Sequence, residues 1–320
     1  MKFSNETYGI RDLFHVNCPE TCVTRILTDL SSLDRDFVPA VHDYWYSDTL
    51  KDVLNYLADP RGDVLYISGG SGNGKTSLIV ETAARLNWPC ISISAGRDMK
   101  PEDLIGSYCQ DRDGVVFTEG PLLTAARRGY IFVLNSVDRV SPDVVSVLRD
   151  AAEQQMINIC NATEVIRVNR MFSLVVTGSA CDVENGYSTG GADCINPQLM
   201  ELCRICRAGQ PGRRELQTIL GIKFPKLNTA EIGVLSSASL KFIESFRGSE
   251  GKEELARLVN YRMVLRWAGL YLQCRSSEQP YRRSLDRALL FRFPASVRDE
   301  WYRILNAVIA EIGACGPVRG

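Results

Sequence analysis

The sequence has no apolar run long enough to span a membrane, and its first residues, 1–6, lack the apolar core of a secretion signal. It also has no excess of one charge, because 37 Lys and Arg stand against 38 Asp and Glu, a formal net charge of −1. A chain without a positive excess has no overall attraction to nucleic acid or to an anionic membrane. We therefore expect a cytoplasmic protein that uses neither as a partner.

Internal repeats and low-complexity tracts are missing as well, which argues against a solenoid or a disordered chain. Of the 320 residues, 45% are hydrophobic and 23% are charged. This balance is typical of a globular protein with a proper core, and the length is sufficient for two domains.

The eleven cysteines are an odd number, and several lie inside apolar segments, as small core residues do in a reducing compartment. Two local clusters stand out, His15 with Cys18 and Cys22, and Cys203 with Cys206. Together they could supply four zinc ligands. About 180 residues separate the clusters, and neither lies in a knuckle-like glycine turn. The spacing favours incidental cysteines and leaves zinc as an alternative.

The most informative stretch is residues 69–76, Gly-Gly-Ser-Gly-Asn-Gly-Lys-Thr, which fits the phosphate-loop pattern of Gly, four residues and Gly-Lys-Thr. An apolar run at 63–68 precedes it, and apolar residues at helical spacing follow over 77–86. A glycine loop that enters a helix turns several N–H groups toward one centre, where they attract phosphate oxygens. The residues predicted to bind phosphate are Gly69, Gly70, Ser71, Gly72, Asn73, Gly74, Lys75, Thr76 and Ser77.

In this pattern Lys75 reaches the β- and γ-phosphates, and the hydroxyl of Thr76 ligates Mg²⁺. The expected cofactors are therefore ATP and Mg²⁺. A glycine-rich turn that matches by chance is the alternative, and the flanking strand and helix argue against it.

Buried strands and helices alternate along the first two thirds of the chain, which predicts an α/β domain with a parallel sheet. The predicted strands are 63–68, 88–94, 130–137 and 171–177, and the predicted helices are 50–57, 77–86, 120–128 and 141–155. Two β-hairpins are expected, within 108–117 and 156–168, and a long polar loop at 181–196.

A change in composition at 210–214, Gln-Pro-Gly-Arg-Arg, marks the expected domain boundary. We assign residues 1–50 to a lead-in packed on the core, 51–210 to the nucleotide-binding core and 211–320 to a helical lid. Helical periodicity predicts lid helices at 230–246, 253–271, 284–290 and 296–312.

An α/β nucleotide domain followed by a helical lid resembles the AAA+ ATPases, in particular their MoxR and dynein-related branch and the small ATPase subunits of aerobic cobalt chelatases. The similar stretches are 37–41, 46–50, 84–90, 119–122 and 195–200. The resemblance covers residues 8–210 well and the lid loosely. It implies a P-loop NTPase (AAA+) core with a parallel sheet and a C-terminal helical lid.

When the family's functional residues are matched to this sequence one by one, the sequence differs from the family after the third strand. The family has Asp-Glu there, the Asp for the Mg²⁺ water shell and the Glu for the attacking water, whereas this sequence has Asn135 and Ser136. Asn135 is neutral and could still accept a hydrogen bond from a Mg²⁺ water. Ser136 cannot polarise water as a carboxylate does.

Two further hydrolytic positions also differ from the family. The sensor Asn after the fourth strand is replaced by Ser179, and the arginine finger by Leu202. Arg204 is a weak substitute for the finger, and we expect it to pair with nearby acids on a solvated face instead. The lid arginine that meets the γ-phosphate has a counterpart in Arg262, with an exposed helix charge as the alternative.

The phosphate-binding parts are therefore kept, while the parts that promote hydrolysis are replaced. This predicts an ATP-binding subunit that hydrolyses ATP weakly or not at all. The resemblance implies a homo- or hetero-oligomeric ring, a hexamer, in a remodelling or chelatase-like complex with a partner bearing a von Willebrand A domain. Two alternatives stay open, an active ATPase that uses Asp138, Glu119 or Arg204 as substitutes, and an interaction module that binds no nucleotide.

Overall fold

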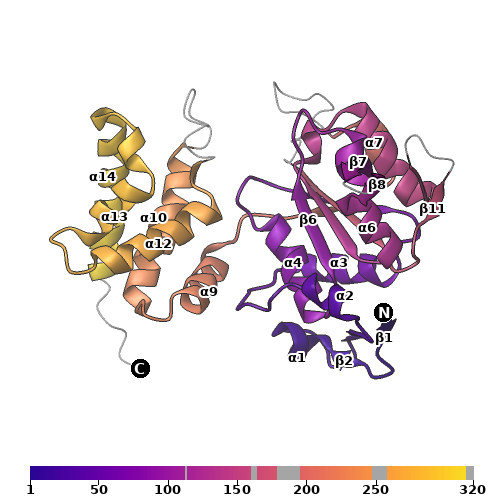
Figure 1. The fold of residues 1–320 in the computed structure, drawn as a ribbon. Coiled ribbons are helices and arrows are strands. Elements are labelled where there is room, and N and C mark those ends of the chain that lie inside the picture. The colour runs from indigo at the N-terminus through magenta and orange to yellow at the C-terminus, as the bar shows by residue number, and fades with distance from the viewer. Residues whose placement is uncertain (112–113, 160–163, 179–194, 247–257, 315–320) are drawn as a thin grey trace. The chain divides into compact units, whose positions relative to one another are not determined.

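The computed structural model describes residues 1–111, 114–159, 164–178, 195–246 and 258–314 (Figure 1). The chain divides into two compact units. The first consists of residues 1–42, 46–69 and 75–208, and the second of residues 43–45, 70–74 and 209–320. None of the described helices is both long and apolar enough to cross a membrane.

A five-stranded parallel sheet forms the centre of the first unit, in the order β13-β5-β12-β9-β6. Its strands are β5 (Val64–Ser68), β6 (Cys90–Ser94), β9 (Ile131–Asn135), β12 (Ser173–Gly178) and β13 (Cys203–Arg207). The four predicted strands and the α/β class are confirmed. β13 was not predicted, because this edge strand has only Ile205 and Cys206 between Arg204 and Arg207 and no continuous apolar run.

The helices of this unit follow the predicted alternation with the strands. They are α3 (Thr49–Ala58), α4 (Lys75–Arg85), α5 (Pro101–Ile105), α6 (Pro121–Arg128), η1 (Val137–Arg139), α7 (Pro142–Arg149), which continues as η2 (Asp150–Gln154), and α8 (Pro197–Met200). The two predicted hairpins are confirmed as β7 (Gly106–Asp111) with β8 (Gly114–Glu119), and β10 (Met156–Asn158) with β11 (Val165–Arg167).

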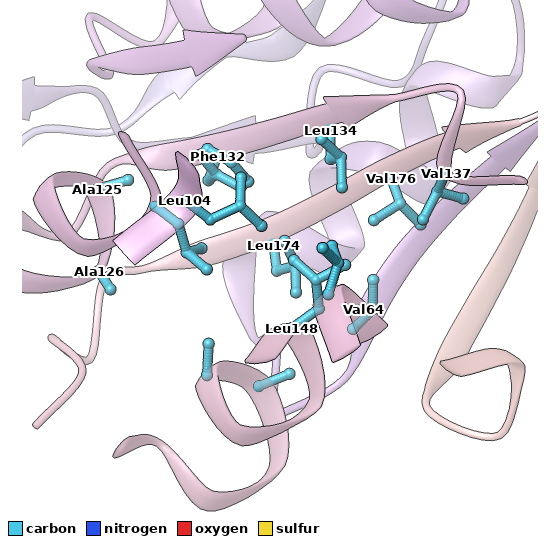
Figure 2. Close-up of a cluster of buried hydrophobic side chains, with 14 of the residues drawn as sticks. Val64, Leu104, Ala125, Ala126, Phe132, Leu134, Val137, Leu148, Leu174 and Val176 are labelled. Atoms are coloured by element: carbon cyan, nitrogen blue, oxygen red, sulfur yellow. The ribbon is translucent and has the colours of Figure 1, made fainter. Parts of the chain in front are cut away.

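A hydrophobic cluster joins the sheet to the helices that cover one of its faces (Figure 2). Phe132 and Leu134 of β9 and Leu174 of β12 meet Leu104 of α5 and Leu148 of α7 in this cluster, and all five are almost fully buried. Burial of a large apolar side chain stabilises the fold by about 1.5–3 kcal/mol. The cluster therefore holds β9 and β12 in place, and polar side chains follow at the ends of these strands.

The lead-in contains short elements that pack on the same core, namely β1 (Lys2–Phe3), β2 (Tyr8–Gly9), α1 (Ile10–Phe14), β3 (Val23–Thr24), β4 (Leu27–Thr28) and α2 (Ser32–Asp36). The amide of Cys90 donates to Phe37 O at 2.9 Å, so the segment after α2 runs beside the edge strand β6. The hydroxyl of Tyr130 donates to Asp34 at 2.5 Å, which anchors α2 on the core.

The second unit is helical, as predicted, with α9 (Arg213–Lys223), α10 (Thr229–Phe246), α12 (Tyr261–Cys274), α13 (Pro280–Ala288), η3 (Leu290–Arg292) and α14 (Ala295–Ala314). Its core contains Phe242, Trp267 and Trp301, and the rings of Phe242 and Trp301 are 4.5 Å apart. The prediction of one continuous helix over 253–271 was wrong. α12 begins at Tyr261 because the side chain of Asn260 caps it, accepting a hydrogen bond from Met263 N at 3.0 Å.

Candidate nucleotide-binding site

The loop between β5 and α4 needs glycine at three of its positions. Gly69, Gly72 and Gly74 all have positive φ, at 156°, 81° and 79°. A Cβ on Gly69 would also collide with the carbonyl oxygen of Ala208. Only glycine adopts such conformations without strain. The glycines that define the phosphate-loop pattern are therefore the ones that this backbone requires.

Lys75 is the first residue of α4, and its Nζ donates to Gly69 O at 2.9 Å. The ammonium is thus held at the first residue of the loop. The first turn of α4 contains no acidic side chain, so nothing there neutralises the partial positive charge of the helix N-terminus. This combination of loop amides, lysine and helix end is suited to an anion such as phosphate.

Asn135 is the last residue of β9, and its side chain connects helix α4 to the sheet. Its Oδ1 accepts hydrogen bonds from the hydroxyl of Thr76 and, at 3.1 Å, from the hydroxyl of Thr177. Its Nδ2 donates to Ile93 O at 2.9 Å and to Ser92 Oγ at 3.0 Å. An amide has two donor hydrogens and two acceptor lone pairs, so all four positions of Asn135 are used.

This geometry does not fit the expected role of Asn135 toward Mg²⁺. Both acceptor positions are occupied, so the amide oxygen has none left for a Mg²⁺ water. The hydroxyl of Thr76 still has lone pairs that could ligate a cation. However, Mg²⁺ sites normally include one or two carboxylates, and the described side chains bonded to the Asn135 amide are all uncharged. Across the described residues, no group of three or more His, Cys, Asp or Glu is arranged to hold a metal ion.

The same result covers the proposed zinc ligands, because His15, Cys18, Cys22, Cys203 and Cys206 are all among the described residues. Burial raises the pKa of the Cys203 thiol to about 12 and that of Cys206 to about 11. Zinc is bound by the thiolate, which burial disfavours here. Cys206 is buried and Cys203 packs against the hydrophobic cluster of the first unit, as expected for small packing residues.

Ser136 follows Asn135 in the left-handed conformation, with φ 60° and ψ 47°, and precedes η1. Its short neutral side chain stands where a water-activating carboxylate is expected. Asp138 lies in η1, and its Oδ1 is buried without a hydrogen-bond partner among the described residues. A Cβ built on Gly178, at the end of β12, would be 3.2 Å from that oxygen. Asp138 thus places a carboxylate at this end of β12.

The substitutes considered for the arginine finger and for the missing acid have other partners. Arg204 Nε lies 2.5 Å from Asp63 Oδ2, and its guanidinium also donates to Pro60 O at 3.3 Å. Leu202 packs against the hydrophobic cluster of the first unit. Glu119 forms a 2.8 Å ion pair with Arg127.

Ser179 lies outside the described residues. Arg262 is an exposed residue in the first turn of α12, and its role toward the γ-phosphate stays a prediction.

The sequence analysis missed the two neighbours that orient Asn135. Thr177 lies directly beside Asn135 in the pairing of β12 with β9, and Ser92 lies on β6, on the other side of β9. A threonine that ends the apolar run at 171–177 was a usable signal in the sequence. Its partner could not be identified without the strand order.

The family model for the AAA domain of the dynein-related subfamily matches residues 64–192. The aerobic cobaltochelatase subunit CobS of Sinorhizobium sp. is 28% identical over 280 residues, which cover 80% of this chain and 82% of CobS.

Shorter matches link the chain to two further proteins. CbbQ of Hydrogenophilus thermoluteolus is 28% identical over 114 residues, 35% of this chain and 43% of CbbQ. NorQ of Paracoccus denitrificans is 35% identical over 91 residues, 28% of this chain and 34% of NorQ. The matched part thus spans less than half the length of either protein.

Among solved structures, NtrX of Brucella abortus superposes with a TM-score of 0.50 at 13% identity, covering 83% of this chain and 69% of NtrX. At this identity the likeness concerns the fold alone. With the phosphate loop, the parallel sheet and the match to CobS over most of both chains, the chain is similar to proteins with an AAA domain of the dynein-related subfamily.

Proposed function

We propose that this chain is an ATP-binding AAA+ subunit that retains ATP, hydrolyses it weakly or not at all, and acts within a ring-shaped remodelling or chelatase-like complex. The observation that carries the proposal is the saturated, neutral amide of Asn135 next to the phosphate loop. Its neighbour Ser136 is equally uncharged.

Binding of ATP is supported by the parts of the loop that need no catalytic acid. The loop glycines allow the backbone amides to converge, and Lys75 supplies a positive charge at the N-terminus of α4. These groups recognise phosphate in the ground state, so they function whether or not the γ-phosphate is cleaved.

Weak hydrolysis is supported by the substitutions at the groups that assist the attacking water. A general base typically contributes about 10²–10⁴ in rate, and Ser136 supplies none. An arginine finger contributes about 10³–10⁵ in related GTPases, and Leu202 is an apolar residue packed on the core. Arg204 is held by Asp63, so it is a poor replacement.

Assembly into a ring is supported by the charge distribution along the sequence. Residues 1–208 contain 19 Lys and Arg against 27 Asp and Glu, and residues 209–320 contain 18 against 11, which gives formal charges of −8 and +7. Opposite charges on two parts of one chain favour head-to-tail association between copies, and such contacts close into rings. We propose a homo- or hetero-oligomeric hexamer on this basis and by analogy with the family.

The β10–β11 hairpin is the surface that we propose for a partner protein with a von Willebrand A domain. The pairing places Met156, Asn158, Val165 and Arg167 on one face, and Met156 and Val165 are 43% and 50% exposed. The partner class comes by analogy, and one relative is named von Willebrand factor A domain-containing protein 8, from Mus musculus. The second proposed partner surface, the loop at 181–196, lies mostly outside the described residues.

Two measurements on the full chain test the proposal together. A thermal-shift titration with ATP measures binding, since a ligand that binds only the native state raises the unfolding temperature. A phosphate-release assay measures hydrolysis. We expect a clear thermal shift and little released phosphate. Absence of any shift would instead support a nucleotide-free interaction module.

An active ATPase is the second candidate, and the buried Oδ1 of Asp138 is the observation in its favour. A carboxylate at the end of β12 could assist a water if it reached the γ-phosphate. Phosphate release that is lost in both Lys75→Ala and Asp138→Asn, but retained in Asp143→Asn, would support this candidate over the first.

A further inference from the structure

We infer that nucleotide binding by this chain does not depend on a divalent cation, and that Asn135 is the positioning residue responsible. The inference rests on the proposed ATP-binding function and deepens it. The starting point is the four hydrogen bonds that fill every donor and acceptor position of the Asn135 side chain.

The first step concerns the orientation of the amide. Its Nδ2 faces two oxygen atoms, Ile93 O at 2.9 Å and Ser92 Oγ at 3.0 Å, and its Oδ1 faces two hydroxyls. The carbonyl oxygen of Ile93 is only an acceptor, so the atom opposite it has to be a donor. The surroundings are therefore matched to an amide, and an aspartate here would place a carboxylate oxygen against a carbonyl oxygen.

The second step concerns the acceptor that a hydrated cation requires. Mg²⁺ keeps several waters when it binds to a protein, and those waters need acceptors, usually carboxylates. Asn135 Oδ1 has two lone pairs. One accepts the hydroxyl of Thr76 and the other accepts the hydroxyl of Thr177, so neither is left for a water on Mg²⁺. Because Thr177 is 3% exposed and lies in register with Asn135 on the next strand, its hydroxyl is fixed there by the sheet.

The charges around Asn135 support the same conclusion. ATP without a cation has about four negative charges, and a carboxylate within a few ångströms repels it unless a cation intervenes. Asn135 and its described partners Thr76, Thr177 and Ser92 are uncharged, whereas Lys75 at the loop is positive. At positions 135 and 136, where the family has carboxylates, the side chains are thus neutral.

The test is a calorimetric titration of the full chain with ATP, once with Mg²⁺ in excess and once with EDTA. We expect the two dissociation constants to agree within about threefold. A dissociation constant at least tenfold lower with Mg²⁺ would overturn this inference and leave the proposed ATP binding intact. No binding under either condition would overturn both.

Two variants identify the residue responsible. Asn135→Asp introduces a carboxylate, and Thr177→Val frees one acceptor position of Asn135 without adding charge. We expect the ratio of the two dissociation constants to rise about tenfold or more in Asn135→Asp and by a smaller factor in Thr177→Val. A merely structural effect would weaken binding equally in Mg²⁺ and EDTA. A ratio unchanged from wild type in folded Asn135→Asp would overturn the role of Asn135.

Discussion

The hydroxyl of Thr76 donates a hydrogen bond to the amide oxygen of Asn135, and this contact joins the phosphate loop to the end of β9. The loop keeps the residue types that bind phosphate, while its partner on the sheet is neutral and fully hydrogen-bonded. Under the proposed function, different side chains are responsible for binding ATP and for the missing hydrolysis. Some of the proposed tests depend on these residues, and others on contacts that lie within a single unit.

Replacing Lys75 with alanine should weaken ATP binding strongly. The ammonium is the positive side chain at the loop, and removing a charge-assisted phosphate contact costs about 1.5–3 kcal/mol, or roughly 10–150-fold in affinity. Isothermal titration measures the loss. Lys51→Ala, at an exposed position of α3, is the matched control and should bind as the wild type does. Equal affinities in the two variants would contradict the assignment of the loop.

Restoring the family residues should not restore an efficient ATPase. In the double variant Asn135→Asp/Ser136→Glu, the new carboxylate faces the carbonyl oxygen of Ile93, and Leu202 still supplies no finger charge. We expect the phosphate-release rate to rise less than about tenfold. A rate near 1 s⁻¹, in the ordinary range for enzymes, would mean that the two substitutions alone explain the missing activity.

The anchoring of α2 should make stability depend on pH through Asp34, which is 8% exposed. Burial would raise its pKa, but hydrogen bonds from Tyr130 and Ser31 and the charge of Arg128 outweigh burial and lower the pKa. A carboxylate whose pKa is lower in the folded state stabilises the fold at pH values above its pKa in the unfolded chain, about 3.9. This stabilisation is lost as the pH falls through the pKa of the folded state. Asp34→Asn should therefore cost about 1–3 kcal/mol at pH 7 and less near pH 3.

Urea unfolding at the two pH values measures this difference. Asp36→Asn, at an exposed position of the same helix, is the control and should show no such dependence. A loss of stability in Asp34→Asn that is equal at both pH values would contradict the electrostatic explanation.

Removal of Glu231 should destabilise the helical unit. This buried carboxylate accepts hydrogen bonds from Tyr271 at 2.8 Å and from Asn228 N at 2.9 Å, and Arg275 Nε lies 2.8 Å away. Glu231→Ala leaves these donors without their acceptor, so we expect a loss of about 2–4 kcal/mol. Glu244→Ala, at an exposed position of α10, should change stability by less than about 0.5 kcal/mol. Thermal denaturation by circular dichroism compares the two variants.

Much of the α/β unit could be predicted because its signals are local. Each central strand is a short apolar run, and the phosphate loop combines glycine chemistry with a strand before it and a helix after it. The edge strand β13 escaped prediction because Arg204 and Arg207 interrupt its apolar pattern, and only the pairing of Cys203–Arg207 with β5 defines it as a strand.

The site could be predicted only in part, for a related reason. The substitution of Asn135 was visible in the sequence, but its consequence depends on Thr177, Ser92 and Ile93, which come from strands on both sides of β9. Which hydrogen-bonding positions of an amide are filled is a property of strand order and register. The expectation that Asn135 serves a Mg²⁺ water stays a prediction, and the two hydroxyls that donate to its Oδ1 argue against it.

The fate of bound ATP tests the central claim most directly. The full chain is incubated with ATP, separated from free nucleotide and quenched, and the bound nucleotide is identified by chromatography while released phosphate is measured. We predict that the chain retains the triphosphate, with phosphate release below about 0.01 s⁻¹, far under ordinary enzyme rates. Bound ADP with phosphate release near 1 s⁻¹, lost in Lys75→Ala, would contradict the account.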